Sequence, residues 1–210
     1  DIVVNNAGIL RDKSFAKMED ADWELVYRVH VEGAYKVTHA AWPHLREQNY
    51  GRVIFTSSTS GIYGNFGQSN YGMAKLGLYG LTRTLALEGR KNNILINAIA
   101  PTGGTRMTEG LIPASVFELL KPELGSPLVV YLTSEQCQES GGLYEVGGGW
   151  IGKVRWERSL GAGFDPRAGF SPEDVAAQWH TINDFADAAH PTDNVEALRE
   201  MMANLHKFPV

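Results

Sequence analysis

The sequence contains very little cysteine and no long apolar stretch. Its single cysteine, Cys137, excludes a framework of internal disulfides and fits a reducing compartment. No apolar run approaches the ~20 residues that a membrane-spanning helix needs. The formal net charge of −5 argues against a broad basic surface for nucleic acid. With 43% apolar and 20% charged residues, the 210-residue chain is typical of a globular domain with its own core.

The histidines and the cysteine lack the spacing of metal ligands. His39 and His44 are five residues apart and share no face of a helix. Cys137 has no second cysteine and no histidine near it in the sequence. We therefore expect no metal centre.

Hydrophobic periodicity predicts strands and helices that alternate along the chain. Strands are expected at 1–5, 51–57, 94–100 and 143–146, and helices at 20–47, 70–89 and 113–134. Pro43 should kink the first helix, and Pro122 and Pro127 should interrupt the third. Residues 58–69 and 102–112 are expected to be loops. This order predicts an α/β fold, a doubly wound parallel sheet of Rossmann type with helices on both faces.

The composition changes after residue 150. We expect residues 1–150 to form the sheet domain and residues 151–210 to form a helical C-terminal extension packed on it. Amphipathic patterns predict helices near 172–188 and 193–205. The three tryptophans of this part and its border, Trp150, Trp156 and Trp179, are expected in the core.

One group of residues carries a pattern that indicates chemistry. Tyr71 and Lys75 stand four apart on a predicted helix, which places both side chains on one face. Alone, this spacing also describes a surface tyrosine beside a solvated lysine. However, Ser58 ends a strand 13 residues before Tyr71, Asn5-Asn6-Ala7-Gly8 closes an earlier strand, and Pro101 ends the next strand. Four such features in this order indicate a single site.

From Asp1 to about Gly149 these motifs resemble the short-chain dehydrogenase/reductase family. The resemblance implies hydride transfer between NAD(P) and an alcohol or ketone. It makes Tyr71 the general acid/base and Ser58 the group that binds the reacting oxygen. Lys75 would lower the pKa of Tyr71 and hold the nicotinamide ribose. A free tyrosine has a pKa near ~10, and a nearby ammonium group favours the phenolate, so these roles are physically sound.

The resemblance also implies a set of cofactor contacts and a partner. NAD is expected as the cofactor, with NADP as the open alternative, because the residues that distinguish them would lie before Asp1. A homodimer through helices 20–47 and 70–89 is expected, with no nucleic-acid or membrane partner. The implied cofactor-binding residues are Asn5, Asn6, Ala7, Gly8, Tyr71, Lys75, Pro101, Thr102 and Thr105.

The sequence departs from the family pattern in two places. His30 stands where the family has an asparagine that supports a proton-relay water. We include His30 among the catalytic candidates, and a purely packed histidine is the equal alternative. Pro101-Thr102 replaces the usual Pro-Gly. Residues 106–125 either form a lid over an acyl chain or pack on the sheet.

The glycine-rich strand-to-helix turn with which the family begins is missing. Neither Gly103-Gly104 nor Gly147-Gly148-Gly149 forms a G-x-G-x-x-G fingerprint. The chain also starts directly in a buried-looking strand, Asp1 to Asn5. We therefore expect an N-terminal truncation that removes the first strands, and we expect this chain alone to fold marginally and bind NAD weakly.

Longer segments indicate one branch of the family. Residues 5–12, 57–67 and 146–158 are similar to the (3R)-hydroxyacyl-CoA dehydrogenases of peroxisomal multifunctional enzymes and their bacterial single-domain relatives. That resemblance implies NAD-dependent oxidation of a (3R)-3-hydroxyacyl-CoA to a 3-ketoacyl-CoA, as in fatty-acid β-oxidation. A stand-alone bacterial type is favoured because no hydratase domain follows. The location would be cytoplasmic, or peroxisomal in a eukaryote.

Two alternatives stay open. The first is a dehydrogenase of the same family acting on another alcohol or ketone, such as a steroid or a carrier-protein ketoacyl substrate, with the same catalytic residues. The second is a truncated scaffold without catalysis. The expected truncation and the change at His30 favour the scaffold, whereas Ser58, Tyr71 and Lys75 argue against it.

Overall fold

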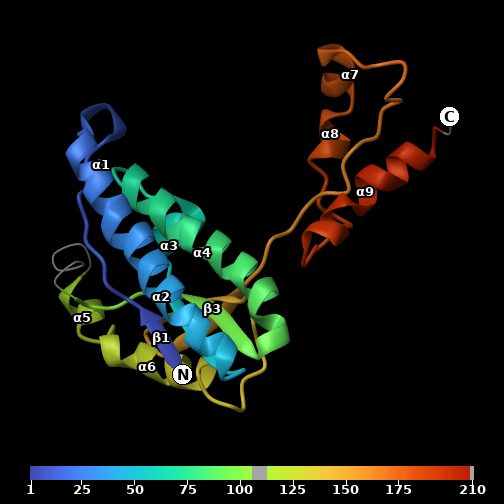
Figure 1. Cartoon of the computed structure of the whole chain (residues 1–210). Helices are drawn as coiled ribbons and strands as arrows, with labels where there is room; N and C mark the ends of the chain where they lie inside the picture. The colour runs from blue at the N-terminus through green and yellow to red at the C-terminus, as the bar shows by residue number, and fades with distance from the viewer. Residues whose placement is uncertain (106–112, 209–210) are drawn as a thin grey trace. The chain divides into compact units, whose positions relative to one another are not determined.

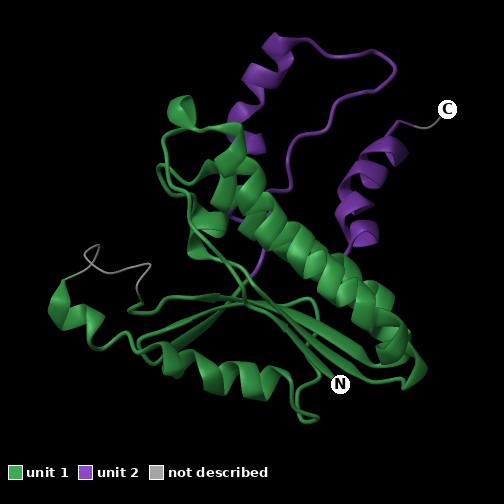
Figure 2. Cartoon of the chain, turned by 60° about the vertical axis from the view of Figure 1, so that its left-hand side comes forward, with its two compact units in different colours: residues 1–154 green, residues 155–210 purple. Residues whose placement is uncertain are grey.

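The computed structural model describes residues 1–105 and 113–208. The chain forms two compact units, Asp1–Val154 and Arg155–Val210, which are coloured separately in Figure 2. The first unit contains the sheet and every residue expected at the site. The second unit contains the C-terminal helices.

A five-stranded sheet forms the centre of the first unit. Its strands are β1 (Ile2–Asn5), β2 (Gly51–Thr56), β3 (Ile94–Pro101), β4 (Leu143–Gly147) and β5 (Trp150–Val154), and they lie in sequence order. The pairs β1–β2, β2–β3 and β3–β4 are parallel, and only β5 is antiparallel. The carboxyl ends of the first four strands therefore meet at one edge, where ligands bind in open α/β sheets.

Helices cover both faces of this sheet (Figures 1 and 2). One face packs against α2 (Gly33–Glu47) and α4 (Ser69–Gly89), and the other packs against α6 (Ser126–Leu132). Alternation along β2 explains this, because Val53 and Phe55 join the first hydrophobic cluster while Ile54 joins the second. The doubly wound, mostly parallel α/β fold is thus confirmed.

The expected helix 20–47 has three parts. It consists of α1 (Asp20–Tyr27), a π-helical segment η2 (Arg28–Glu32) and α2. Pro43 lies inside α2, which continues to Glu47. π-Segments within α-helices are rare and frequently lie at functional sites, and this one carries His30.

The expected loop 58–69 contains a short helix, α3 (Thr59–Tyr63), so that prediction was wrong. Ser58 caps this helix, because its Oγ accepts a hydrogen bond from the Ser60 N–H at 3.1 Å. A Cβ built on Gly61 would lie 2.8 Å from the Leu76 backbone nitrogen. The glycine that suggested a loop instead lets α3 lie directly on α4.

The end of the sheet also differs from the prediction. The last strand that the sequence predicts is β4. It is followed by a fifth strand, β5, where the C-terminal extension was expected to begin. Gly148 and Gly149, with φ of 56° and 81°, form a two-residue turn between them. Positive φ at both positions is the requirement of a tight hairpin turn, which is why glycine occurs at both.

The remaining helical segments of the first unit are short. They are η1 (Phe15–Lys17), η3 (Arg90–Asn92), α5 (Ala114–Phe117) and η4 (Pro122–Gly125). The interruptions expected near Pro122 and Pro127 are present, because η4 starts at Pro122 and Pro127 lies in the first turn of α6. Proline tolerates these positions, where the backbone N–H needs no helical partner.

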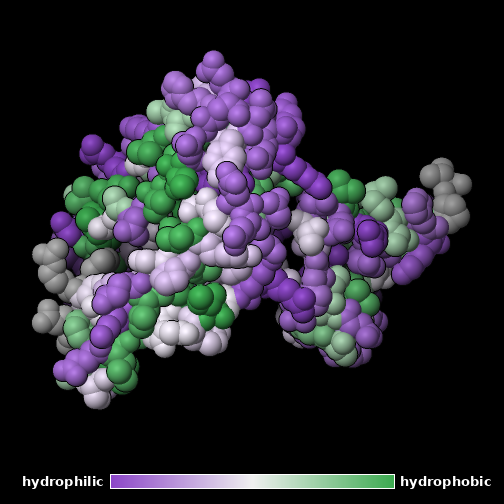
Figure 3. Space-filling model, turned by 90° about the horizontal axis from the view of Figure 1, so that it is seen from below, coloured by the Kyte–Doolittle hydropathy of each residue, from purple (hydrophilic) through white to green (hydrophobic). Residues whose placement is uncertain are grey.

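Over its described residues, 155–208, the second unit contains three helices, α7 (Pro172–Ala177), α8 (Trp179–Ile182) and α9 (Asn194–His206). None of the three contains a buried residue. Trp150, Trp156 and Trp179 are all exposed, so the prediction that they belong to the core was wrong. Hydrophobic groups are visible among hydrophilic ones at the surface in Figure 3.

Candidate active site

The carboxyl edge of the sheet brings together the residues expected at the site. Asn5 to Gly8 follow β1, Ser57 and Ser58 follow β2, and Pro101 ends β3. The first two turns of α4 add Tyr71 and Lys75. Segments from four elements therefore meet where the strand register places them.

Ser58, Tyr71 and Lys75 lie together, as the motif predicts. The Ser58 hydroxyl lies beside the Tyr71 phenol, and its interaction with the phenol acts to lower the pKa of Tyr71. The Lys75 Nζ lies 5.5 Å from the centre of the Tyr71 ring. The serine and tyrosine can thus contact the same oxygen atom, with the lysine beside them.

Lys75 is buried and is held at both its ammonium group and its backbone. Its Nζ donates to the Thr56 carbonyl oxygen at 2.6 Å, and its own carbonyl accepts from Ser57 Oγ at 2.8 Å. Burial lowers the pKa of Lys75 to about 8. The side chain therefore still carries its charge at neutral pH.

Tyr71 differs from expectation in its acidity. Burial raises its pKa above the ordinary value, the charge of Asp12 acts in the same direction, and only the Ser58 hydrogen bond opposes them. Lys75 was expected to lower this pKa. In the structure burial outweighs the other effects, and Tyr71 is a neutral phenol that is able to donate a proton.

His30 packs between the loop after β1 and the Tyr71 ring. Its Nε2 lies 3.0 Å from the backbone nitrogen and 2.9 Å from the carbonyl oxygen of Ile9. Its ring meets that of Tyr71 edge-on, with centroids 5.2 Å apart and planes at 86°. Burial, assisted by the charge of Lys75, lowers the pKa of His30 to about 4, so the imidazole is neutral.

Gly8 makes this arrangement sterically feasible. A Cβ on Gly8 would lie 2.5 Å from His30 Cε1, closer than real side-chain contacts. The glycine of the Asn-Asn-Ala-Gly motif therefore provides the space that the His30 ring occupies.

The two asparagines of that motif make hydrogen bonds within the protein. Asn5 Nδ2 donates to Thr38 Oγ1 at 2.9 Å, and Thr56 Oγ1 donates to Asn6 Oδ1 at 3.0 Å. They tie β1 to α2 and to the end of β2. Ala7 is exposed at the edge.

The loop after β3 reaches the same edge. Pro101 is exposed, and the Thr102 N–H donates to the Val146 carbonyl at 2.8 Å, which extends the sheet pairing. Thr105 also belongs to the described part of the loop. The next residues of the expected lid, 106–112, lie outside the described residues.

These residues fit one half of a nicotinamide dinucleotide. The Lys75 ammonium and the Tyr71 hydroxyl are donors suited to ribose oxygens, and the small residues Ala7 and Gly8 leave the backbone accessible. The 210-residue sequence contains no G-x-G-x-x-G turn for the pyrophosphate. The fit therefore extends to the nicotinamide-ribose half.

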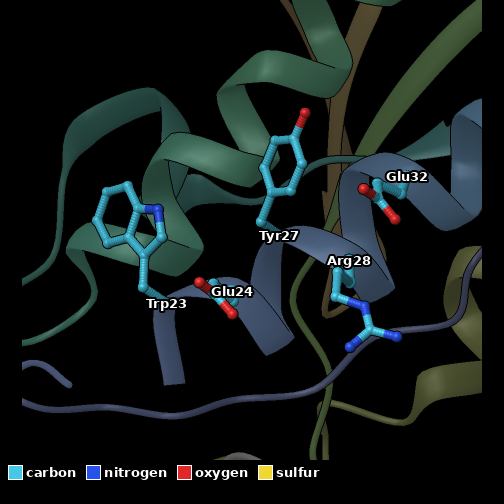
Figure 4. A pocket seen from close by; sticks show the side chains of 5 residues that line it. All are labelled: Trp23, Glu24, Tyr27, Arg28 and Glu32. Carbon is cyan, nitrogen blue, oxygen red and sulfur yellow. The ribbon is translucent and has the colours of Figure 1, made fainter. Parts of the chain in front are cut away.

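A shallow pocket of about 370 Å³ is lined by other residues (Figure 4). It is lined by side chains of α1 and η2, namely Trp23, Glu24, Tyr27, Arg28 and Glu32. None of them is an expected catalytic residue. Within residues 1–105 and 113–208 no group of His, Cys, Asp or Glu could hold a metal ion, and no helix is long and apolar enough to cross a membrane.

Sequence reasoning missed the residues that support the site from behind. Ser57 Oγ donates to the Lys75 carbonyl, and Thr56 Oγ1 donates to Asn6 Oδ1. Asn70 Oδ1 accepts from the Tyr71 N–H at the start of α4. Their roles depend on contacts between segments far apart in the sequence. Only Ser57, adjacent to Ser58, carried any local signal.

Comparisons with known proteins agree with this geometry. The short chain dehydrogenase family model matches residues 1–114. The chain is 55% identical over 208 residues to the peroxisomal multifunctional enzyme type 2 of Mus musculus, covering 99% of this chain and 28% of that protein. It is 48% identical over 209 residues to the peroxisomal multifunctional enzyme A of Dictyostelium discoideum, covering 100% of this chain and 47% of that protein.

The solved structure of full-length peroxisomal multifunctional enzyme type 2 from Drosophila melanogaster has the same fold. The TM-score is 0.90 at 45% identity, covering 97% of this chain and 38% of that one. The chain thus spans between about a quarter and a half of the length of these relatives. The family model and the Ser58–Tyr71–Lys75 geometry establish that the chain belongs to the short-chain dehydrogenase/reductase family of NAD(P)-dependent oxidoreductases.

Proposed function

We propose that this chain forms the catalytic part of an NAD-dependent dehydrogenase that converts (3R)-3-hydroxyacyl-CoA to 3-ketoacyl-CoA. The observation that carries the reaction class is the contact of Ser58 with Tyr71, beside the charged Lys75. The substrate rests on similarity to peroxisomal multifunctional enzymes. The compartment is then the peroxisome in a eukaryote and the cytoplasm in a bacterium.

The chain supplies the proton chemistry of this reaction. A bound nicotinamide would accept the hydride from the carbinol carbon. Ser58 orients the substrate oxygen, and Tyr71 in its phenolate form removes the hydroxyl proton. Because Tyr71 is a neutral phenol in the structure, it must first release its proton for oxidation.

This requirement gives the two directions opposite pH responses. Oxidation needs the phenolate, so its rate should rise with pH toward the raised pKa of Tyr71. Reduction needs the phenol, so its rate should stay level at neutral pH and fall at alkaline pH. Rates that rise together with pH in both directions would contradict the assignment of Tyr71.

The first test is NADH appearance at 340 nm with separate (3R)- and (3S)-3-hydroxyacyl-CoA, using the complete protein that carries these residues. Turnover of the R form alone is the expected result. Turnover of the S form, or of neither form, would overturn the proposed substrate. Replacing NAD by NADP in the same assay decides the cofactor.

The Tyr71→Phe variant separates an enzyme from a scaffold. General acid/base groups contribute about 10²- to 10⁴-fold, so turnover should fall by that factor with the fold unchanged. Tyr131→Phe, an exposed tyrosine on α6, is the matched control and should keep full activity. Equal activity in both variants would contradict a catalytic Tyr71.

A second candidate function is reduction of a carrier-protein ketoacyl substrate. The neutral phenol of Tyr71 can donate the proton that such a reduction needs, whichever thioester is bound. Consumption of NADPH with a 3-ketoacyl carrier protein, and none with the CoA thioester, would establish it over the first.

We also propose that the chain forms a homodimer through the helices at 20–47 and 70–89. Tyr35 and Val37 on α2 and Leu87 on α4 are exposed apolar residues. Nothing lies within 4 Å of a Cβ built on Gly77 or Gly80, so the backbone of α4 is open to close approach. Sedimentation of wild type and Gly80→Trp should show a dimer that the variant loses, and a monomeric wild type would refute it.

A further inference from the structure

Asn70, which directly precedes Tyr71, is completely buried at 0% exposure. A buried asparagine must find hydrogen-bond partners for the acceptor oxygen and the two donor hydrogens of its amide. Here all three functions are used. The acceptor contacts the catalytic helix, and the two donor hydrogens contact two other segments.

The acceptor side satisfies the backbone of the catalytic residue itself. Asn70 Oδ1 accepts a hydrogen bond from the Tyr71 N–H at 2.7 Å. The first backbone N–H groups of a helix have no partner within the helix. Gln68, the N-cap residue, makes no side-chain capping bond, and the buried hydroxyl of Ser69 has no hydrogen-bond partner. Asn70 therefore provides the cap that its neighbours do not.

The donor side connects α4 to the segment after β1 and to α1. Asn70 Nδ2 donates to the Arg11 carbonyl at 3.1 Å and to the Asp22 carbonyl at 3.4 Å. The Asp22 carboxylate also pairs with Lys13 Nζ at 2.9 Å. The segment after β1, the start of α1 and the start of α4 are thus joined by the amide of Asn70.

Neighbouring contacts reinforce the same junction. The Lys13 N–H donates to the Gly67 carbonyl at 2.9 Å, and Gln68 Nε2 donates to the Asp12 carboxylate at 2.8 Å. The segment 11–13 continues directly from the Asn5–Gly8 motif and from Ile9, which His30 contacts. The junction therefore fixes the start of α4 relative to the loop expected to hold the cofactor.

We propose that Asn70 is the positioning residue of Tyr71, fixing the Tyr71 phenol against Ser58 and the loop after β1. The inference deepens the proposed function and rests on it for its kinetic consequence. Asn70 does not contact the reacting atoms, so its effect passes through the placement of Tyr71. A small displacement of a catalytic group can cost about 10²-fold in rate.

The experiment compares Asn70→Ala with Asn97→Ala in the complete protein. Asn97 is a matched control, because it is also 0% exposed and clamps β3 through the Glu139 carbonyl at 2.7 Å and the Gly142 N–H at 3.0 Å, with no bond to the site. Both variants should lose thermal stability. Only Asn70→Ala should lose kcat, by about 10- to 100-fold, with KM values near those of wild type.

Asn70→Ser supplies the conservative rescue. Its hydroxyl retains an oxygen that can accept from the Tyr71 N–H, so part of the lost kcat should return. This variant also keeps the test valid if Asn70→Ala does not fold. Equal kcat in wild type, Asn70→Ala and Asn97→Ala, or equal losses in the two alanine variants, would overturn the proposal.

A spectroscopic arm separates failure of this inference from failure of the proposed function. The ¹³Cζ resonance of Tyr71, assigned with Tyr71→Phe, reports its titration without any substrate. Asn70→Ala should move that titration toward an ordinary tyrosine, and Asn97→Ala should not. If wild type turns over no hydroxyacyl-CoA but this shift occurs, the substrate proposal fails and the positioning role stands. An unchanged titration overturns the positioning role.

Discussion

Residues 51–101 and residues 155–210 differ in what determines their structure. In the first region every residue of β2 is buried, and α4 contains eight buried residues, three of them the polar Asn70, Lys75 and Thr82. In the second region the three helices have no buried residue, and α7 and α9 begin with side-chain caps. Tertiary burial therefore fixes side-chain positions and pKa values in the first region, whereas the helices of the second region depend on hydrogen bonds at their surfaces and ends.

The sharpest contrast should come from removing one aromatic ring in each region. Phe55→Ala empties a fully buried position between the sheet and α2 and α4, and should lower the unfolding free energy by about 3–5 kcal/mol. Phe185→Ala, at an exposed phenylalanine, should change it by only about 0.5 kcal/mol. Denaturant unfolding of both variants measures this, and similar losses would break the comparison.

His30 should make the first region sensitive to acid. Burial lowers the pKa of His30 to about 4 in the folded state, whereas an unfolded histidine takes up a proton near its ordinary pKa of about 6.5. Between these values the unfolded state binds more protons, so stability should fall as pH drops, by about 3 kcal/mol in total. His30→Asn should flatten this slope, and parallel curves for the two proteins would contradict the cause.

Gly61 tests the close contact of α3 with α4. Gly61→Ala forces a Cβ to within 2.8 Å of the Leu76 backbone nitrogen and should cost about 1–3 kcal/mol. Gly33→Ala is the matched control, because its Cβ would meet nothing nearer than the Arg28 carbonyl at 3.6 Å. The control should be neutral or should stabilise the protein by up to about 1 kcal/mol. Thermal melts distinguish the two, and equal shifts would contradict the packing argument.

The second region should respond to loss of a cap. Ser171 Oγ accepts from the Asp174 N–H at 3.2 Å, and the Ser171 N–H donates to the Asp174 carboxylate at 2.9 Å. Ser171→Ala should destabilise α7 by about 1 kcal/mol. Hydrogen exchange of residues 172–177 reports this locally. Unchanged protection there would mean that tertiary contacts hold α7 and would weaken the comparison.

The smallest effect should come from the exposed side of α9. Leu198 lies on this helix with Met201, Met202 and Leu205, and all four are exposed. Leu198→Gln should change the unfolding free energy by about 0.5 kcal/mol or less. A loss above about 1 kcal/mol in a chemical melt would show that another surface covers this side in solution.

The same contrast explains how much of the fold the sequence predicts. The periodic apolar pattern of 70–89 and the β-branched runs at 51–57 and 94–100 lie within a residue or two of α4, β2 and β3. The π-segment at Arg28–Glu32 was not predicted, because the apolar spacing of 20–47 reads as one continuous helix. The strand β5 was missed although Gly148-Gly149 followed by Trp150 is a readable hairpin signal.

The site divides in a similar way. The spacing of Tyr71, Lys75 and Ser58 was enough to place three chemical groups together. The direction of the Tyr71 pKa was not predictable from spacing, because burial determines it. The role of Asn70 could not be predicted from the sequence, since its partners Arg11 and Asp22 lie 59 and 48 residues away.

The parallel pairing of β1, β2 and β3 has a consequence for how activity appears during folding. Asn5 lies opposite Phe55, and Phe55 lies opposite Ala98, so each pairing must close a long stretch of chain. Contacts between residues distant in sequence form slowly, whereas helices form within about a microsecond. On refolding, helical signal should return first and turnover last, because the catalytic edge does not exist until all three strands are in register.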